Sequence, residues 1–133
     1  MILEFCVSNF LSIKDELKLS FVATTLKESL SEPNDVIPLS DMGLSLVRSA
    51  VIYGANASGK TNVLKAIAFY KRFIVDSFKN SQAGESIDVK NFRLNISTIH
   101  EPTTMEATFA VGEYIYRYGF EVDQKAIHAE WLY

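Results

Sequence analysis

The sequence predicts an α/β domain in which a mixed sheet carries a glycine-rich loop and its helix and continues into antiparallel strands. Three observations support this prediction. An apolar stretch runs into the loop Gly54-Ala-Asn-Ala-Ser-Gly-Lys-Thr61, the segment after the loop has a helical period, and the last third of the chain alternates apolar and polar residues. The 133 residues are 48% hydrophobic and 22% charged, which is typical of one folded globular domain.

The N-terminal segment has the period of a strand. Leu3, Phe5 and Val7 alternate with other residues, as one face of a strand requires. A second alternating run over residues 17–22 predicts a hairpin with the first. Residues 23–45 show no sustained period and contain turn-forming residues, so we expect a surface loop there.

The central segment predicts a strand, a turn and a helix in succession. Residues 46–53 are almost continuously apolar and end against Gly54, as a buried strand that leads into a tight turn would. The following residues place apolar side chains three and four positions apart. This apolar face comprises Val63, Ala66, Ile67, Tyr70, Ile74 and Phe78. A polar stretch at 80–86, with Gly84, is expected to end the helix.

Three alternating runs fill the last third, at residues 105–111, 114–122 and 127–131. Short turn-forming segments separate them, and this pattern predicts an antiparallel meander. Its alternating aromatic residues would suit a platform on which nucleic acid bases stack, but cross-strand packing in a half-buried sheet explains them better.

The loop at residues 54–61 carries the chemistry. It satisfies the Gly-x-x-x-x-Gly-Lys-Thr pattern, which binds the phosphates of a nucleoside triphosphate. Gly54 and Gly59 allow the backbone to approach the phosphates, and the amides near the helix start point towards them. Lys60 supplies a positive charge to the β- and γ-phosphates, and Thr61 offers a hydroxyl to Mg²⁺. The predicted site therefore uses Mg-ATP.

The predicted nucleotide-binding residues are Gly54, Ala55, Asn56, Ala57, Ser58, Gly59, Lys60, Thr61 and Asn62. Lys60 is also the candidate catalytic residue, and Thr61 is the candidate metal ligand. The alternative is an ordinary glycine- and serine-rich turn in which Lys60 is simply solvated. A lysine at a helix N-terminus is unfavourable for the helix dipole, so an anionic partner accounts for it better.

The longer segment Gly54-Ala-Asn-Ala-Ser-Gly-Lys-Thr-Asn-Val-Leu-Lys-Ala-Ile67 resembles the ABC-type ATPase heads of the SMC and RecF group, and most closely bacterial AAA-family ATPases related to OLD proteins. The N-terminal Val7-Ser-Asn-Phe-Leu-Ser-Ile-Lys14 looks like the opening strand and turn of these heads, and the last strands look like theirs. The resemblance implies the N-terminal lobe of a P-loop NTPase, with residues 1–133 forming part of an ATP-binding head.

The resemblance also assigns roles to single residues. It implies that Asn56 contacts the phosphates and that Ser12 lies in a turn near the nucleotide, whereas Leu11 stands where the family often has an arginine. It further implies a homodimer that holds ATP between two heads, with nucleic acid or an effector nuclease as possible partners, in phage defence or DNA repair.

A complete head also needs a Walker B strand that ends in Asp-Glu, a signature loop and a switch histidine, and the sequence has no good match for them. Phe73–Asp76 falls within the helical period, and Phe120–Asp123 is interrupted by Glu121. We therefore expect the chain to be the N-terminal part of a longer ATPase. A nucleotide-sensing module without hydrolysis and a P-loop phosphotransferase remain alternatives.

The remaining residues suggest no second chemistry. A lone Cys6 favours a small buried residue in a reducing compartment, and the absence of a leader or a long apolar run favours a cytoplasmic protein without a membrane partner. His100 and His128 are expected to be surface or hydrogen-bonded residues. A basic stripe on the helix is expected to be solvated rather than bound to DNA. It comprises Lys65, Lys71, Arg72 and Lys79.

Overall fold

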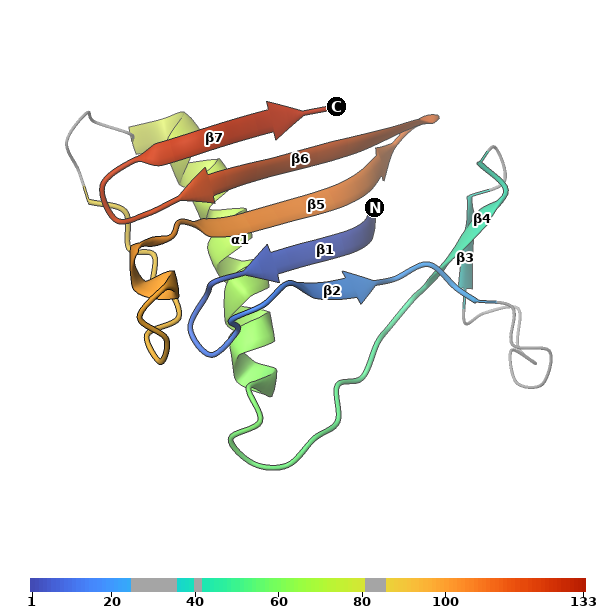
Figure 1. Cartoon of the computed structure of the whole chain (residues 1–133). Coiled ribbons are helices and arrows are strands. Elements are labelled where there is room, and N and C mark those ends of the chain that lie inside the picture. Colours follow the sequence, from blue (N-terminus) through green and yellow to red (C-terminus); the bar gives the residue numbers. More distant parts are fainter. Residues whose placement is uncertain (25–35, 40–41, 81–85) are drawn as a thin grey trace.

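A computed structural model describes residues 1–24, 36–39, 42–80 and 86–133, with the backbone only at 77–80. One five-stranded sheet, in the order β2-β1-β5-β6-β7, lies against a long helix, and a two-stranded ribbon lies to one side (Figure 1). The elements are β1 (Ile2–Ser8), β2 (Leu17–Ser20), β3 (Val36–Leu39), β4 (Leu44–Val47), α1 (Lys60–Asn80), the 3₁₀ helix η2 (Thr98–His100), β5 (Thr103–Val111), β6 (Tyr114–Val122) and β7 (Ile127–Leu132).

The N-terminal hairpin and the C-terminal meander are confirmed. β1 pairs with β2 on one side and with β5 on the other, and β5, β6 and β7 follow one another in the sheet. All of these pairings are antiparallel. The first and last thirds of the sequence therefore form one sheet, because β1 lies beside β5 with Phe5 opposite Ala107.

The core lies between this sheet and α1. Phe5, Val7 and Phe120 are buried on the sheet side, and the helix contributes the face predicted from its period, including Ala66 and Tyr70. Full burial of a side chain such as Phe120 contributes about 1.5–3 kcal/mol to the stability of the folded state. Aromatic rings connect the two layers, with Phe73 and Phe120 centroids 4.3 Å apart. The predicted contribution of Phe78 lies outside the described side chains.

The helix positions one polar group inside this core. The Tyr70 hydroxyl donates a hydrogen bond to the Tyr118 carbonyl oxygen at 2.9 Å, and burial raises the pKa of Tyr70 above its ordinary value. The Tyr118 hydroxyl in turn donates to Glu130 Oε1. Tyr118 and Phe120 thus pack as predicted for the aromatic residues of the meander, whereas Tyr114 is exposed at the far end of β6.

The predicted buried strand over residues 46–53 is wrong. β4 ends at Val47, and the chain then runs without regular structure to the loop, with Val51 70% and Tyr53 87% exposed. A strand persists only where a neighbour accepts its backbone hydrogen bonds, and within the described residues none lies beside 51–53. The predicted antiparallel strands and helix are therefore present, whereas the part of the chain that the structure describes contains no strand that leads into the loop.

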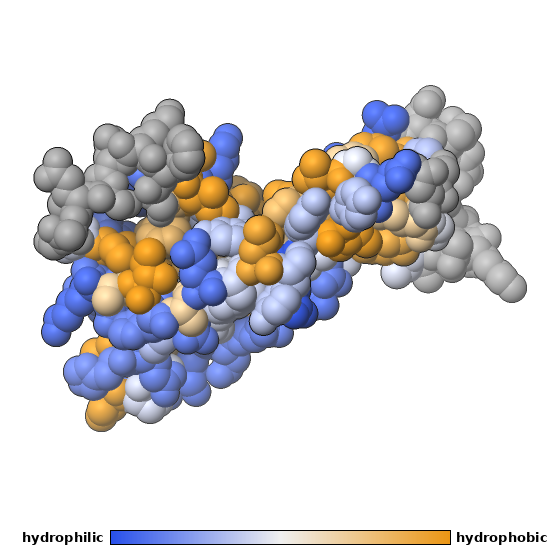
Figure 2. Space-filling view, turned by 90° about the horizontal axis from the view of Figure 1, so that it is seen from above, coloured by the Kyte–Doolittle hydropathy of each residue, from blue (hydrophilic) through white to orange (hydrophobic). Residues whose placement is uncertain are grey.

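The predicted surface loop at residues 23–45 is also partly wrong. Its described part contains β3, which pairs with β4 so that Pro38 lies opposite Ser45. The rest of the expected loop lies outside the described residues. Leu46 packs on Leu3 and Ala110 and so attaches this ribbon to the main sheet. Figure 2 shows the ribbon extending to one side of the body, with apolar residues on its surface.

Two further sequence expectations concern exposure. Cys6 is half-buried rather than buried, because it lies on the face of β1 opposite to Phe5 and Val7; what burial it has raises the pKa of its thiol. Among the described residues no helix is long and apolar enough to cross a membrane.

Candidate functional site

The glycine-rich loop lies at the end of α1, which begins at Lys60. Two residues of the loop have left-handed backbones, Ala57 with φ of 63° and Gly59 with φ of 91°. The Gly59 carbonyl oxygen accepts hydrogen bonds from the amides of Asn62 at 2.8 Å and Val63 at 3.3 Å. The amides just before these belong to the first helical turn, which has no intrahelical acceptors for them, so they are available to an anion.

Lys60 folds back over the loop. Its Nζ donates hydrogen bonds to the carbonyl oxygens of Gly54 at 2.8 Å and Ala55 at 2.5 Å and lies 3.4 Å from Ser58 Oγ. The ammonium group therefore stands at the loop that the motif predicts as the phosphate site. Its acceptors are neutral carbonyl groups, so its full positive charge is available to an anionic ligand.

The loop leaves little space for a side chain at its two glycines. A Cβ atom at Gly54 would lie 2.8 Å from Ser58 Oγ, and one at Gly59 would lie 3.0 Å from Ser12 Oγ. Gly59 also has a φ that side-chain-bearing residues rarely adopt. Substitution at Gly59 would therefore strain the loop backbone, whereas a side chain at Gly54 would require the Ser58 hydroxyl to rotate away.

Ser12 lies next to the loop although about fifty residues separate them. The Ser12 hydroxyl oxygen accepts a hydrogen bond from Asn62 Nδ2 at 2.7 Å. Ser12 stands in a tight turn closed by mutual backbone hydrogen bonds of 2.8 Å between Phe10 and Ile13. Leu11, in the same turn, has φ of 51° and donates its amide to the Lys90 carbonyl oxygen at 2.8 Å. The structure thus brings together the two segments from which site residues were predicted.

Asn9 holds this turn in place, and the sequence analysis missed it. Asn9 is only 4% exposed, and its Nδ2 lies 2.9 Å from the Thr98 carbonyl oxygen, 2.8 Å from that of Glu101 and 3.2 Å from that of Pro102. Its Oδ1 accepts the Phe92 amide at 3.0 Å. A single polar residue in a turn has no periodic signal, so only its contacts reveal it.

The rejected Walker B candidates have other roles. Asp76 lies within α1, as its period predicted. Asp123 follows β6, where Oδ1 accepts the amides of Lys125 at 2.7 Å and Ala126 at 2.8 Å and Oδ2 lies 3.0 Å from His128 Nε2. The hydrogen bond to His128 and these two amides lower the pKa of Asp123 to about 2. Asp123 therefore caps a turn.

No second site emerges from the other predicted residues. Across the described ranges, no three His, Cys, Asp or Glu side chains are grouped so that they could hold a metal. His100 is exposed at the end of η2. In the basic stripe, Lys65 and Lys71 are exposed and Arg72 lies 4.0 Å from Asp88, whereas the Lys79 side chain is not described.

A glycine-rich loop with the pattern Gly-x-x-x-x-Gly-Lys-Thr that leads into a helix N-terminus, with the lysine ammonium group beside the loop, is the motif of P-loop domains. The family is given by a comparison with known domain families. Residues 49–133 match the family described as "AAA domain, putative AbiEii toxin, Type IV TA system", and the chain belongs to this family. Comparisons with curated proteins and with solved structures gave no match.

Proposed function

We propose that the chain binds Mg-ATP through the loop at residues 54–61. The observation that carries the proposal is the position of Lys60, whose ammonium group stands over the left-handed loop at the start of α1. The loop fits a triphosphate because its two glycines leave no side chain in the way and its helix-start amides are free to donate. AAA domains use ATP and Mg²⁺ in general, and the family match agrees with this ligand.

Each residue has a distinct part in the proposed site. Amides from Asn56 to Thr61 would surround the phosphates, and Lys60 would leave the Gly54 and Ala55 carbonyls to pair with them. Thr61 would ligate Mg²⁺, which neutralises charge on the phosphates when bound. Ser12 holds Asn62 at 2.7 Å and so orients the first helical turn.

We further propose that this site belongs to a longer cytoplasmic ATPase of the SMC, RecF and OLD kind. Support comes from the resemblance at residues 7–14 and from the contact of Ser12, within that segment, with Asn62. In such a protein ATP would be held between two heads, and their closure would regulate a partner nuclease or a DNA-related activity. A Walker B carboxylate would have to be a residue other than Asp76, which lies within α1, and Asp123, which caps a turn.

A binding experiment tests the first proposal. Titration of the chain with Mg-ATP is expected to show saturable binding, and Lys60→Ala should weaken it about 10- to 100-fold, because charge-assisted hydrogen bonds to phosphate contribute about 1.5–3 kcal/mol. Lys65→Ala, an exposed lysine one helical turn further along, is the matched control and should bind as the wild type does. Equal affinity in the Lys60→Ala variant would refute the phosphate assignment.

Steady-state hydrolysis by the full-length protein separates an ATPase from a sensing module. An ATPase should lose turnover in the Lys60→Ala variant. A protein that binds Mg-ATP but produces no phosphate above background would instead be a nucleotide sensor.

A further inference from the structure

A groove of about 290 Å³ lies on the face of the sheet that points away from α1. On β1 this is the face that carries Cys6, and among the described elements α1 covers only the opposite face (Figure 1). No residue of the loop at 54–61 lines the groove, so it is separate from the proposed ATP site. Its volume suits one side chain of a partner better than a whole drug-sized molecule.

The strand register arranges the residues of the groove in two neighbouring rows across the sheet. The first row comprises Cys6, Glu106, Gly119 and Trp131, and the second comprises Ser8, Thr104 and Glu121. All of these except Gly119 line the groove. Side chains that are diagonal neighbours in adjacent rows are about 7–8 Å apart, within reach of aromatic and long side chains. Glu121 and Trp131 can therefore contact one group that binds between them.

The indole of Trp131 is held in place at this groove. It lies across Gly119, where a Cβ atom would be 2.5 Å from Trp131 Cζ2. Its Nε1 donates a 2.7 Å hydrogen bond to Glu106 Oε2. Trp131 is only half-buried, so part of the ring can contact a ligand in the groove. An aromatic ring that is fixed in this way offers a cation its π electrons.

The groove carries uncompensated negative charge. Its charged lining residues are all carboxylates, at Glu16, Glu106 and Glu121. Glu106 has Arg117 Nε at 3.6 Å, whereas neither Glu16 nor Glu121 forms an ion pair with a described residue. Glu16 is exposed and Glu121 is half-buried, so both carboxylates can accept hydrogen bonds from a ligand.

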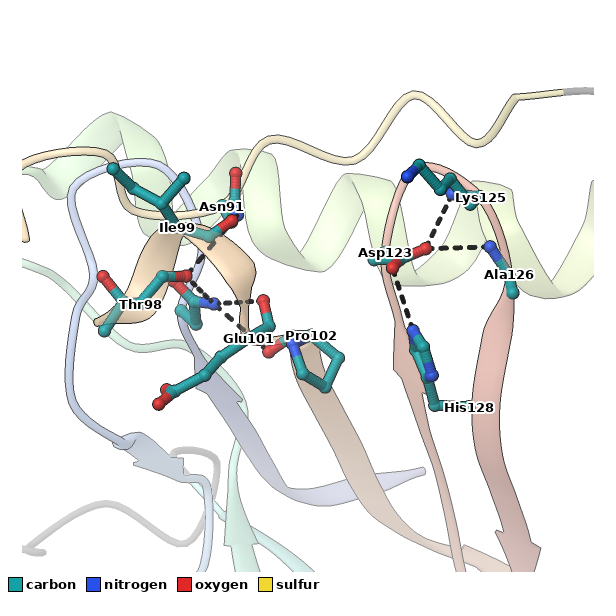
Figure 3. Close-up of polar contacts among 10 residues, drawn as sticks. Asn91, Thr98, Ile99, Glu101, Pro102, Asp123, Lys125, Ala126 and His128 are labelled. Carbon is teal, nitrogen blue, oxygen red and sulfur yellow. Dashed lines mark hydrogen bonds and ion pairs between the residues drawn. The ribbon is translucent and has the colours of Figure 1, made fainter. Parts of the chain in front are cut away.

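The charged groups beside the groove compensate one another. They are Lys14 next to Asp15, Lys18 with Glu4 at 2.7 Å, and Lys125 in the turn where Asp123 lies 3.0 Å from His128 (Figure 3). None of these residues lines the groove. The carboxylates of Glu16 and Glu121 therefore determine the charge that a ligand meets.

A guanidinium group fits these partners better than an ammonium group does. It is planar, stacks on aromatic rings and pairs with a carboxylate through two parallel hydrogen bonds. Its five N–H donors can also reach the hydroxyl oxygens of Ser8 and Thr104, which line the groove. Free arginine would bring its own carboxylate into this acidic groove, so charge complementarity favours an arginine within a peptide chain.

We propose that this groove docks an arginine side chain from a basic segment of a partner protein. The guanidinium group contacts the ring of Trp131 and pairs with Glu121, and Glu16 attracts further positive charge on the same segment. The proposal does not depend on ATP binding, since the groove and the loop share no residue.

Titration of the full chain with peptide, followed by tryptophan fluorescence, tests the proposal, because Trp131 is the single tryptophan. Acetyl-Gly-Arg-Gly-Arg-Gly-amide is expected to change the emission saturably. The same peptide with citrulline in place of arginine keeps the shape but lacks the charge, and it should bind about tenfold more weakly. The Lys60→Ala variant should bind the arginine peptide as the wild type does.

Two sets of substitutions locate the peptide on the chain. The double substitution Glu16→Gln with Glu121→Gln should weaken binding of the arginine peptide about fivefold, as expected for the loss of partly exposed ion pairs. Glu113→Gln, which removes an exposed carboxylate from the turn between β5 and β6, is the matched control and should not change the affinity.

The absence of a saturable change in emission at millimolar peptide would overturn the proposal. Equal affinity for the citrulline peptide, which is measured on the wild type, or equal affinity in the double variant would do the same. Free arginine that binds as tightly as the peptide would identify a small-molecule site instead of a partner. Emission that changes with protein concentration in the absence of peptide would show that a second copy fills the groove, and either result would overturn the proposal.

Discussion

Asn9→Ala is expected to be among the most destabilising single substitutions in this chain. The Asn9 side chain connects the turn that carries Ser12 to the segment at residues 92–102, and almost none of it reaches solvent. Alanine removes every one of these hydrogen bonds and leaves partners that are buried at Thr98 and part-buried at the other positions. The backbone at this position has φ of 51°, a left-handed conformation that asparagine adopts more readily than alanine does.

The expected loss of stability follows from the number of hydrogen bonds that the Asn9 side chain can form. The Nδ2 group has two hydrogens, so its three carbonyl contacts amount to two hydrogen bonds, and Oδ1 accepts a third. At about 1 kcal/mol each these contribute about 3 kcal/mol. The left-handed backbone adds about 1 kcal/mol for alanine but not for glycine. We therefore expect a loss of about 4 kcal/mol for Asn9→Ala and about 3 kcal/mol for Asn9→Gly.

Urea unfolding, followed by circular dichroism, measures both variants. Asn95→Ala is the matched control, because Asn95 also caps a turn, accepting the Ser97 amide at 3.0 Å, but is only half-buried and its partner Ser97 is exposed. We expect less than about 1 kcal/mol there. A loss of stability below about 1 kcal/mol for Asn9→Ala would refute the role of the Asn9 hydrogen bonds. An equal loss in the alanine and glycine variants would refute only the contribution assigned to the left-handed backbone.

Two further predictions concern the meander. In Gly119→Ala the new Cβ would lie 2.5 Å from Trp131 Cζ2, so the indole should move away from the sheet and lose its 2.7 Å hydrogen bond to Glu106. We expect this to lower the free energy of unfolding by about 1–3 kcal/mol. The fluorescence emission of this single tryptophan should shift to the red, and an unchanged spectrum would contradict the prediction. Asp123→Asn should be less stable than the wild type at neutral pH. The pKa of Asp123 is lowered from 3.8 to about 2, so its contribution to stability is present above pH 3.8 and is lost as the pH falls towards 2. The difference in melting temperature between the wild type and Asp123→Asn should therefore shrink between pH 3.8 and pH 2. A difference that persists at pH 2 would count against the prediction.

The elements that the sequence predicted correctly are those with a local signal. In α1 the face that holds Ala66 and Tyr70 is visible in the 3.6-residue period, and in β5 and β6 the two-residue alternation marks the buried side chains. These periods show which face of each element is buried, and in this protein the buried faces of the sheet and the helix pack against each other. The helix and the strands could therefore be predicted before it was known what they pack against.

The errors arise where a distant partner decides the structure. The apolar residues from Val51 to Tyr53 indicate a preference for burial but do not say which strand would pair with them. β3 lacked a recognisable period, because Pro38 interrupts it and only its pairing with β4 defines it. The Asn9 side chain makes its hydrogen bonds 83 to 93 residues further along the chain, a distance over which no local pattern extends.

The residues of the candidate site also differ in whether a local sequence pattern predicts them. The residues of the loop at 54–61 are contiguous, and their spacing alone predicts a phosphate site. Ser12 was suggested only by family resemblance, and its contact with Asn62 is a property of the folded chain.

The pairing of β1 with β5 has a consequence for the order in which the protein assembles. The two strands are separated by roughly a hundred residues, so β1 has only the short β2 as a neighbour while a ribosome is still making the middle of the chain. The helix that follows the loop is likewise synthesised before β5 and β6, which supply Met105 and Phe120 beneath it. The turn that carries Ser12 also waits for residues 98–102, to which Asn9 bonds. A nascent chain can therefore bury Phe5 and Tyr70 in the core only after β5 and β6 have emerged, and until then these two side chains remain exposed to solvent.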